Sequence, residues 1–413
     1  MTLRTNLVDS EVPWLGHVPP GWTMKPLWSM FERIKDVDHP DERMLSVFRE
    51  FGVIAKDSRD NLNQTAENRS IYQLVHPGWL VANRMKAWQG SVGISSLRGI
   101  VSGHYICFAP RHGEDNRYLN WLLRSTAYAN GYSLLSRGVR IGQAEIDNDQ
   151  LRLMPILLPP VQEQRTIADY LDRETARIDT LIEEQQRLVE MLRERRQAII
   201  DLAFSMLESP RIQLRRHIRF LTSGSRGWGD YYADEGERFV RIGNLPRGNL
   251  DLRGDIQFVD IPLEVTEGSR TILKAEDLLF SITAYLGSVA VVGGDWVGAY
   301  VSQHVALCRL ESEHMDSRFI GWFMLTTTGQ DQLKEGAAGG AKMQLALDDI
   351  RGLRVPLAPI NEQRNIAASL DERTAKIDTL IAETERFIEL ARERRSALIT
   401  AAVTGQINVR EAA

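Results

Sequence analysis

Cysteine is nearly missing from this chain, since its 413 residues include only Cys107 and Cys308. Two cysteines exclude a disulfide framework or a cysteine-rich zinc site, and they fit a reducing compartment. No apolar run approaches the roughly 18 residues that a membrane-spanning helix needs. The first residues, MTLRTNLVDSEVPW, also lack the apolar core of a signal peptide. These absences predict a cytoplasmic protein without a membrane segment.

Positive charge is not in excess either, because the formal net charge is −5 at pH 7. Overall attraction therefore cannot hold nucleic acid, and an anionic partner must meet local basic patches or a second subunit. The sequence also has no Asp/Asn-Pro-Pro-Tyr/Phe tetrapeptide of amino-methyltransferases, no G-x-x-x-x-G-K-S/T phosphate loop and no HExxH motif. These properties are consistent with a protein that recognises a partner without doing chemistry.

What the sequence does contain is a repeat with a spacing of 199 residues. The stretch RIDTLIEEQQRLVEMLRERR (177–196) returns as KIDTLIAETERFIELARERR (376–395), and 21 of the 36 positions from 165 to 200 are identical to their counterparts. Both copies follow prolines and carry apolar residues at heptad spacing, which predicts two long helices. The segments between them echo each other more faintly and alternate apolar with polar residues, which predicts strands.

The chain is therefore expected to be an α+β protein with an internal two-fold repeat. Its length of 413 residues fits two or three domains. The predicted segments are a first mixed α/β domain (1–160), a central helix (161–207), a second mixed domain (208–357), a C-terminal helix (358–404) and a tail (405–413).

The two helices are expected to pair as an antiparallel coiled coil, because the end of the first and the start of the second both join the second domain. Antiparallel pairing centred on Gln185 and Thr384 would bring Glu174 near Arg394 and Arg395, whereas parallel pairing would stack RERR on RERR. The same register would bring Glu372 near Arg195 and Arg196. A helix of about 40 residues is about 60 Å long, so the pair would act as a spacer.

The heptads define a seam between the helices. The predicted seam residues are Leu171, Ile178, Leu181, Leu188, Leu192, Ile199, Leu370, Ile377, Leu380, Phe387 and Leu398. The alternative is that each helix packs only on its own domain.

This alternation of two diverged domains with two near-identical helices resembles the specificity (S) subunit of type I restriction–modification enzymes. The resemblance covers essentially the whole chain. It rests on the order and duplication of the P-x-x-EQ-x-x-I-A helix openings, PGWLVANRMKAWQGSVGIS (77–95), FVRIGNLPRGNLDL (239–252), DLLFSITAYLGSVAVV (277–292) and ALITAAVTGQINVRE (397–411). The first 75 residues lack a clear counterpart of RIGN (241–244).

The resemblance implies two target-recognition domains, each for one half of a split DNA site, and a helix pair that fixes the gap and docks two methyltransferase subunits. Those subunits would use S-adenosylmethionine, and two restriction/translocase subunits would use ATP and Mg²⁺. This chain would bind no cofactor or metal and would not be catalytic alone. The alternatives are a twin-domain DNA-binding regulator or scaffold without a methylase, and a stand-alone DNA-modifying enzyme.

Recognition of bases needs Arg, Asn or Gln side chains, while Lys and Arg suit phosphates. NRMKAWQG (83–90) gathers such residues around a predicted turn, whereas its counterpart ITAYLG (282–287) is apolar. SRGVRIGQ (136–143) and AAGGAKMQ (337–344) each place a cation two residues after a glycine, and SGSRGWGDYY (223–232) sets an arginine among aromatic residues. The candidate DNA-binding residues are Asn83, Arg84, Lys86, Gln89, Arg137, Arg140, Arg226, Lys342 and Gln344.

His104 and His304 recur at matching positions, in VSGH and VSQH. They are either a duplicated structural residue or a catalytic pair. The sequence alone leaves both interpretations open.

Overall fold

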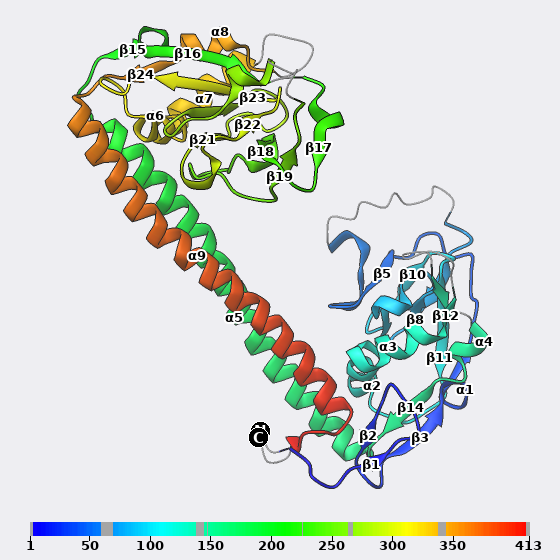
Figure 1. Ribbon diagram of the computed structural model, residues 1–413. Helices are drawn as coiled ribbons and strands as arrows, with labels where there is room; N and C mark the ends of the chain where they lie inside the picture. The colour runs from blue at the N-terminus through cyan, green and yellow to red at the C-terminus, as the bar shows by residue number, and fades with distance from the viewer. Residues whose placement is uncertain are drawn as a thin grey trace. The chain divides into compact units, whose positions relative to one another are not determined.

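The computed structural model describes residues 3–58, 69–137, 144–146, 148–224, 226–262, 267–337 and 344–409. Contacts divide the chain into two compact units, unit 1 (residues 1–186 and 386–413) and unit 2 (residues 187–385) (Figure 1). Each unit holds one globular domain and part of each long helix. The five segments expected from the sequence give each helix a segment of its own, and that segmentation stays a prediction.

Unit 1 is a mixed domain with the start of one long helix and the end of the other. Its strands are β1 (Val8–Asp9), β2 (His17–Val18), β3 (Thr23–Pro26), β4 (Phe31–Arg33), β5 (Leu45–Phe48), β6 (Gly52–Ala55), β7 (Gln73–Val75), β8 (Leu80–Asn83), β9 (Val92–Ile94), β10 (Gly99–Val101), β11 (Tyr105–Pro110), β12 (Ser136–Arg137), β13 (Glu145–Ile146) and β14 (Pro155–Leu158). Its short helices are α1 (Leu27–Met30), α2 (Asn116–Arg124), α3 (Thr126–Leu135) and α4 (Asn148–Leu151), with the 3₁₀ helices η1 (Lys56–Ser58) and η2 (Ala87–Gln89). The long helix α5 (Val161–Ser205) begins here, and α9 (Ile360–Val403) ends here.

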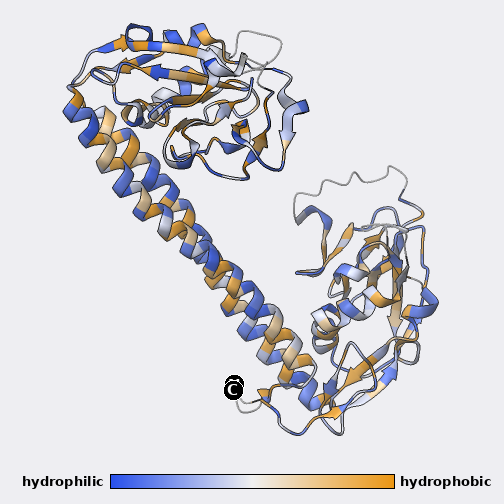
Figure 2. Cartoon of the chain, viewed as in Figure 1, coloured by the Kyte–Doolittle hydropathy of each residue, from blue (hydrophilic) through white to orange (hydrophobic). Residues whose placement is uncertain are grey.

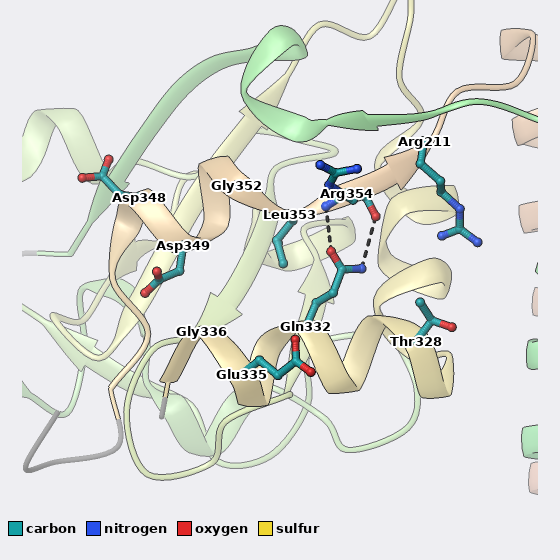
Figure 3. A pocket seen from close by; sticks show the side chains of 10 residues that line it. All are labelled: Arg211, Thr328, Gln332, Glu335, Gly336, Asp348, Asp349, Gly352, Leu353 and Arg354. Carbon is teal, nitrogen blue, oxygen red and sulfur yellow. Dashed lines mark hydrogen bonds between the residues drawn. The ribbon is translucent and has the colours of Figure 1, made fainter. Parts of the chain in front are cut away.

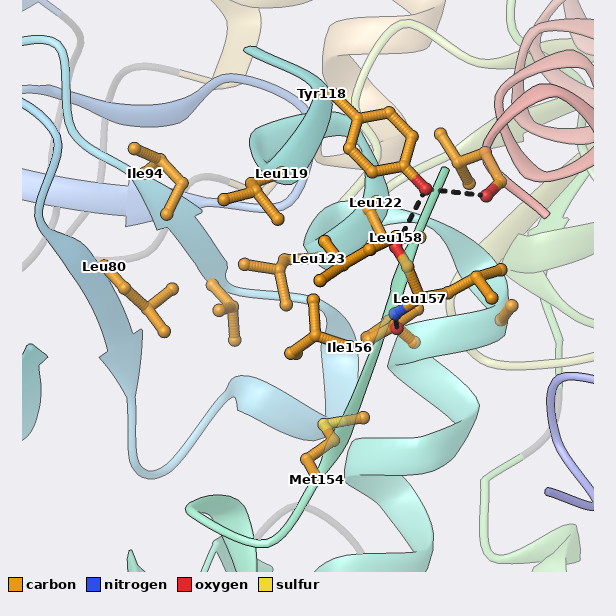
Figure 4. Close-up of a cluster of buried hydrophobic side chains, with 14 of the residues drawn as sticks. Leu80, Ile94, Tyr118, Leu119, Leu122, Leu123, Met154, Ile156, Leu157 and Leu158 are labelled. Carbon is orange, nitrogen blue, oxygen red and sulfur yellow. Dashed lines mark hydrogen bonds between the residues drawn. The ribbon is translucent and has the colours of Figure 1, made fainter. Parts of the chain in front are cut away.

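The centre of unit 1 is the antiparallel sheet β4–β11–β8–β9, which packs against α2. Helix α2 forms where it does because Asp115 caps it by accepting hydrogen bonds from two backbone N–H groups of its first turn. Its apolar face then buries Tyr118, Leu119, Leu122 and Leu123 completely (Figure 4). The Tyr118 hydroxyl donates to the Leu157 carbonyl at 3.0 Å and lies 3.2 Å from the carbonyl of Val403 on α9. The core of the domain is therefore continuous with α9.

Unit 2 has the same core elements in the same order. Its strands are β15 (Arg211–Gln213), β16 (Ile218–Ser223), β17 (Tyr232–Ala233), β18 (Glu237–Val240), β19 (Gln257–Val259), β20 (Leu278–Ser281), β21 (Val289–Val291), β22 (Tyr300–Val301), β23 (Val305–Leu310) and β24 (Arg354–Pro356). Its helices are α6 (Ser317–Met324), α7 (Thr327–Ala337) and α8 (Leu347–Gly352), with η3 (Leu214–His217), η4 (Trp228–Tyr231), η5 (Ile242–Asn244), η6 (Glu267–Thr271) and η7 (Gly294–Trp296).

The central sheet of unit 2, β16–β23–β20–β21, matches that of unit 1 strand for strand. The helix α6 covers it as α2 does in unit 1, and the pair β15–β24 corresponds to β3–β14. The units differ in the segments beside this core. Unit 2 builds a second sheet, β17–β19–β18–β22, in which β18 and β22 run parallel, whereas unit 1 has the antiparallel pairs β5–β6 and β7–β10.

The helices α5 and α9 pair in an antiparallel sense (Figure 1). In unit 2, Arg196 lies 2.7 Å from Asp378 and Arg193 lies 2.7 Å from Glu385, so positions that descend in α5 ascend in α9. In unit 1, Arg395 lies 2.8 Å from Asp179, which is the same pair one repeat away.

The ion pairs expected at the helix ends are wrong. Glu174 pairs with Arg173 and Arg177 of its own helix, at 3.1 and 2.8 Å. Glu372 pairs with Lys376, at 2.7 Å. Exposed ion pairs contribute too little free energy to fix a register, so the buried seam sets it instead.

The seam itself also differs from the expected one. Leu181, Leu380 and Phe387 are 37, 48 and 43% exposed, so their assignment to the seam is wrong. Residues one position later form the inner row, because one residue turns a helix by about 100°. Of the remaining predicted residues, Leu171, Leu192, Leu370, Ile377 and Leu398 are buried, and Ile178, Leu188 and Ile199 are partly buried. The inner row that the sequence did not predict consists of Thr175, Ile182, Val189 and Arg196 on α5 and Thr374, Ile381, Ile388 and Arg395 on α9.

The two ends of the chain meet in unit 1. Leu3 forms a bridge with Ile407, and the Arg4 N–H donates to the Gln406 carbonyl at 2.9 Å. The turn after α9 needs Gly405, whose φ is +72° and whose added Cβ would lie 2.3 Å from Pro19 Cγ. Within the described ranges, no helix is long and apolar enough to span a membrane.

Candidate nucleic-acid interface

The tip of the β8–β9 hairpin in unit 1 is a meeting point of three segments. The Arg84 N–H donates to the His104 carbonyl at 2.9 Å, and the Ile146 N–H donates to the Arg84 carbonyl at 3.0 Å. The Arg84 guanidinium forms an ion pair with Glu145. The hairpin tip, the turn before β11 and the segment 144–146 are thereby held side by side.

The four sequence-predicted residues of this tip fall into two groups. Asn83 serves the turn, because its Oδ1 accepts the Met85 N–H at 3.1 Å. Arg84, Lys86 and Gln89 are exposed. The structure thus brings three polar side chains to one exposed tip, and their contact with DNA stays a prediction.

Two further predicted residues of the first domain belong to the next loop. Arg137 lies opposite Glu145 in the β12–β13 pair, and Glu145 in turn pairs with Arg84. The backbone of Arg137 therefore adjoins the same tip. Arg140 lies outside the described residues.

Unit 2 repeats this arrangement with different side chains. The Ile282 N–H donates to the His304 carbonyl at 3.1 Å, and the Leu345 N–H donates to the Ile282 carbonyl at 3.0 Å. These bonds match those of Arg84 one for one. Gln344 is exposed directly beside the tip. Lys342, the other residue predicted for this loop, lies outside the described residues.

The two histidines hold the tips in place. Each offers its backbone carbonyl to a hairpin tip, and the His304 ring is also 2.9 Å from the Thr283 hydroxyl through Nδ1. Both side chains are exposed. These contacts support the structural interpretation of the repeated histidines.

Arg226 belongs to the same edge of unit 2. Two residues before it, the Gly224 N–H donates to the Val305 carbonyl at 3.2 Å, and an added Cβ at Gly224 would lie 1.9 Å from the Val301 carbonyl oxygen. Only glycine permits this approach to the turn that contains His304. Arg226, two residues after this close approach, is exposed.

Arg247 and Tyr285 are candidate interface residues that the sequence did not suggest. The apolar tip ITAYLG buries Ile282 but leaves Tyr285 48% exposed. The Arg247 guanidinium carbon lies 4.4 Å from the centre of the Tyr285 ring. Because the two residues are 38 positions apart in the chain, only the fold brings the cation to this tip.

The described chain also has a hollow in unit 2 and two buried cysteines. A hollow of about 560 Å³ in unit 2 is lined by Arg211, Thr328, Gln332, Glu335, Gly336, Asp348, Asp349, Gly352, Leu353 and Arg354 (Figure 3). Its Gln332 side chain is engaged by the backbone of Arg354, at 2.7 and 3.2 Å. Burial raises the pKa of the Cys107 and Cys308 thiols to about 12, so neither is an activated nucleophile near neutral pH.

Each domain is joined to both long helices by the same junction. In unit 1, Trp121 Nε1 donates to Asp172 of α5 at 2.8 Å, and Arg117 lies 3.2 Å from the same carboxylate. The Arg395 guanidinium carbon, on α9, lies 5.9 Å from the centre of the Trp121 ring. The junction therefore needs one residue from each helix.

The junction of unit 2 exchanges the roles of the helices. Trp322 Nε1 donates to Asp371 of α9 at 2.9 Å, and Arg318 lies 2.6 Å from it. Arg196, on α5, lies 5.7 Å from the Trp322 ring. Burial by itself acts to lower the pKa of Arg318, but hydrogen bonds to Asp371 and Asp251 outweigh it and raise that pKa. This guanidinium is therefore a permanent cation.

Three apolar side chains of the helix pair stay exposed or partly buried in each unit, and each set of three is called a patch here. The unit 1 patch consists of Leu181 on α5 with Phe387 and Leu390 on α9. The unit 2 patch consists of Leu380 on α9 with Leu188 and Met191 on α5. The two patches correspond residue for residue under the 199-residue repeat, and Figure 2 shows apolar residues along both helices.

Comparisons with known proteins agree with this architecture. The model of the family described as "Type I restriction modification DNA specificity domain" matches residues 66–191 and 244–389. The specificity subunit of the type I restriction enzyme StySPI from Salmonella potsdam is 21% identical, over 95% of this chain and 90% of that protein. The EcoKI specificity subunit from Escherichia coli K12 is 23% identical over the same shares.

Solved structures show the same fold. A chain from a structure described as "Structural basis underlying complex assembly and conformational transition of the type I R-M system" superimposes with a TM-score of 0.73. It is 14% identical and the match covers 94% of this chain and 99% of that one. The HsdS subunit from Thermoanaerobacter tengcongensis gives a TM-score of 0.54 at 16% identity, over 96% of this chain and 100% of that one.

Proposed function

This chain belongs to the type I restriction modification DNA specificity family and is a specificity subunit of that class, and from that premise we propose how it divides its work. Each domain recognises one half of a bipartite, asymmetric DNA site. The helix pair sets the gap between the halves and docks the methyltransferase subunits. Chemistry belongs to those subunits, which use S-adenosylmethionine, and to restriction/translocase subunits, which use ATP and Mg²⁺.

The observation that supports two half-sites is the pair of matching hairpin tips. Both tips are held by the same two backbone hydrogen bonds, centred on Arg84 in unit 1 and Ile282 in unit 2. Their exposed side chains differ, since unit 1 presents Arg84, Lys86 and Gln89 where unit 2 presents Tyr285. Base recognition depends on the side chains that reach the base edges, so two tips with one backbone and different side chains suit two different sequences.

The apolar patches support two copies of a docking partner. Leu390 is 50% exposed and Met191 is 57% exposed. Exposed apolar side chains that lie together commonly mark a surface that another protein covers. Since the patches are equivalent, one methyltransferase subunit would dock on each.

The junctions support the spacer role. Each domain is tied to both helices through a tryptophan, Trp121 or Trp322, that is hydrogen-bonded to an aspartate and lies beside an arginine of the other helix. Such a junction resists rotation of the domain about either helix alone. The orientation of each tip would then follow from the helix pair.

Mapping of methylated adenines in a host that expresses this chain with its methyltransferase subunit tests the proposal. We expect one interrupted site with two unlike halves, and no methylation when this chain is omitted. A DNA-binding regulator without a methylase is the second candidate, and it would bind DNA without recruiting a methyltransferase. A continuous site, or methylation that does not depend on this chain, would contradict the proposal.

A further inference from the structure

The Arg247–Tyr285 pair is an exposed cation and ring that no structural role within the described chain explains. Tyr285 is 48% exposed, and the Arg247 side chain is exposed beside it. Among the residues that the structure describes, the guanidinium makes neither an ion pair nor a hydrogen bond, and its carbon lies 4.4 Å from the centre of the ring. Its N–H groups therefore keep unused hydrogen-bonding capacity among the described residues.

Both residues are held by rigid loops. Asn244 is buried and fixes the loop that carries Arg247, because its Oδ1 accepts the Arg241 N–H at 2.9 Å. Its Nδ2 donates to the carbonyls of Arg253 and Asp255, at 3.1 and 3.0 Å. The RIGN segment is thus the anchor of the Arg247 loop.

The tip that carries Tyr285 is fixed from the other side. Gln330 Nε2 donates to the Gly287 carbonyl at 2.9 Å and to the Met324 carbonyl at 2.8 Å. Gly287 has a φ of +92°, and an added Cβ would lie 2.3 Å from Gln330 Oε1. Ala284, next to Tyr285, has a φ of +50°, a conformation that a non-glycine residue adopts only at some cost in free energy. The fold maintains this backbone conformation on both sides of Tyr285.

We propose that Arg247 recognises a guanine in the second half-site and that Tyr285 positions it. This inference rests on the proposed function and names a recognition residue within it. A guanidinium has a planar fork of donors that matches O6 and N7 of guanine in the major groove. When the fork is held against the ring, less conformational entropy is lost on binding. A bidentate contact to a base depends on the orientation of the fork, whereas a contact to a phosphate depends on it much less.

The corresponding tip of unit 1 also combines an aromatic ring with cations. Trp88 stands two residues before Gly90, as Tyr285 stands two residues before Gly287. Its Nε1 donates to the Met85 carbonyl at 3.0 Å, and Lys86 beside it is exposed. Unit 1 takes its cations from the tip itself, whereas unit 2 takes Arg247 from another loop.

The test measures DNA binding by the complex of the full chain with its methyltransferase subunits, once methylation mapping has given the site. Duplexes carry each single base-pair change in the second half-site, and the variants are Arg247→Ala, Arg247→Lys, Tyr285→Ala and Tyr285→Phe. We expect Arg247→Ala to abolish discrimination at one G·C pair, a loss of about 5- to 150-fold. Arg247→Lys should lose most of it because the fork is gone, and Tyr285→Ala should lose part while Tyr285→Phe keeps it.

Controls distinguish this inference from the proposed function. Arg351→Ala removes another exposed arginine of the same domain, one that is paired with Asp348 at 2.7 Å, and should change nothing. Discrimination in the first half-site should also stay intact in every variant, which shows that the complex is folded. Equal weakening on all sequences with a shallower salt dependence would reveal a phosphate contact and overturn the inference, as would unchanged binding. A wild-type complex without two half-sites would instead overturn the proposed function.

Discussion

Units 1 and 2 share a core and differ at the surface that it supports. The sheets β4–β11–β8–β9 and β16–β23–β20–β21 correspond strand for strand, and both hairpin tips are held by the same two backbone bonds. The tips carry Arg84 and Lys86 in one unit and Tyr285 with a borrowed Arg247 in the other. Backbone bonds do not depend on the side chains, so a frame that both units share can support two unrelated surfaces.

The largest expected effect comes from pairing two copies of the first domain with its long helix. In a fragment of residues 1–207, Ile199, Ile200 and Ala203 of a second copy can take the places of Leu398, Ile399 and Ala402 in the core of unit 1. We expect a two-fold symmetric dimer that directs methylation to an interrupted palindrome of the first half-site. Light scattering and methylation mapping measure this. A folded fragment that stays monomeric would show that the two helices are not interchangeable.

The second prediction separates the two patches. Phe387→Glu with Leu390→Glu places two charges on the unit 1 patch, and Leu188→Glu with Met191→Glu does the same on the unit 2 patch. Burying these carboxylates under a partner would be unfavourable, so each double variant should bind one methyltransferase subunit and the quadruple variant none. Native mass spectrometry counts the subunits.

The matched control for the patches is Gln186→Glu, an exposed position that belongs to neither patch. It should leave two methyltransferase subunits bound. Two subunits on the quadruple variant would show that docking uses another surface.

The third prediction compares the two junction tryptophans. Trp322 is 2% exposed, whereas Trp121 is only partly buried. Trp322→Ala should therefore lower the free energy of unfolding by ~3–5 kcal/mol, and Trp121→Ala by less. Urea unfolding followed by circular dichroism measures both. The Trp→Phe variants lose the hydrogen bond to the aspartate but keep an aromatic ring, so they should lower the free energy of unfolding less than the Ala variants do. An equal loss for Trp322→Ala and Trp121→Ala would contradict the burial argument.

The smallest effect concerns His112 of unit 1, whose ring centre lies 4.6 Å from that of Phe31. Burial lowers the pKa of His112, so the unfolded chain binds its proton more readily than the folded one. The stability that depends on the neutral ring is complete above the unfolded pKa of ~6.5 and is lost as pH falls through the lower folded pKa. In that pH range the free energy of unfolding of the His112→Asn variant, measured by urea titration, should depend less on pH than that of the wild type. Equal slopes for the two proteins would refute the assignment.

The repeat made much of the fold predictable. Near-identity around Ile178 and Ile377 required two like helices, and the connection of both to the second domain required an antiparallel pair. The starts of α2 and α6 also follow from local chemistry, because Asp115 and Asp316 cap these helices through side-chain hydrogen bonds. These features depend on residues close in sequence or on the order of the segments.

The register of the helix pair and the make-up of the interface were decided by the tertiary structure. Leu181 and Ile182 are both strongly apolar, so the sequence could not tell which of them lies inside. In the structure Ile182 is only 9% exposed, whereas Leu181 is 37% exposed. The ion pair of Arg196 with Asp378, and the cation that Arg247 brings to Tyr285, join residues far apart in the chain. Local patterns determine which elements form, but which faces meet depends on how all the elements pack together.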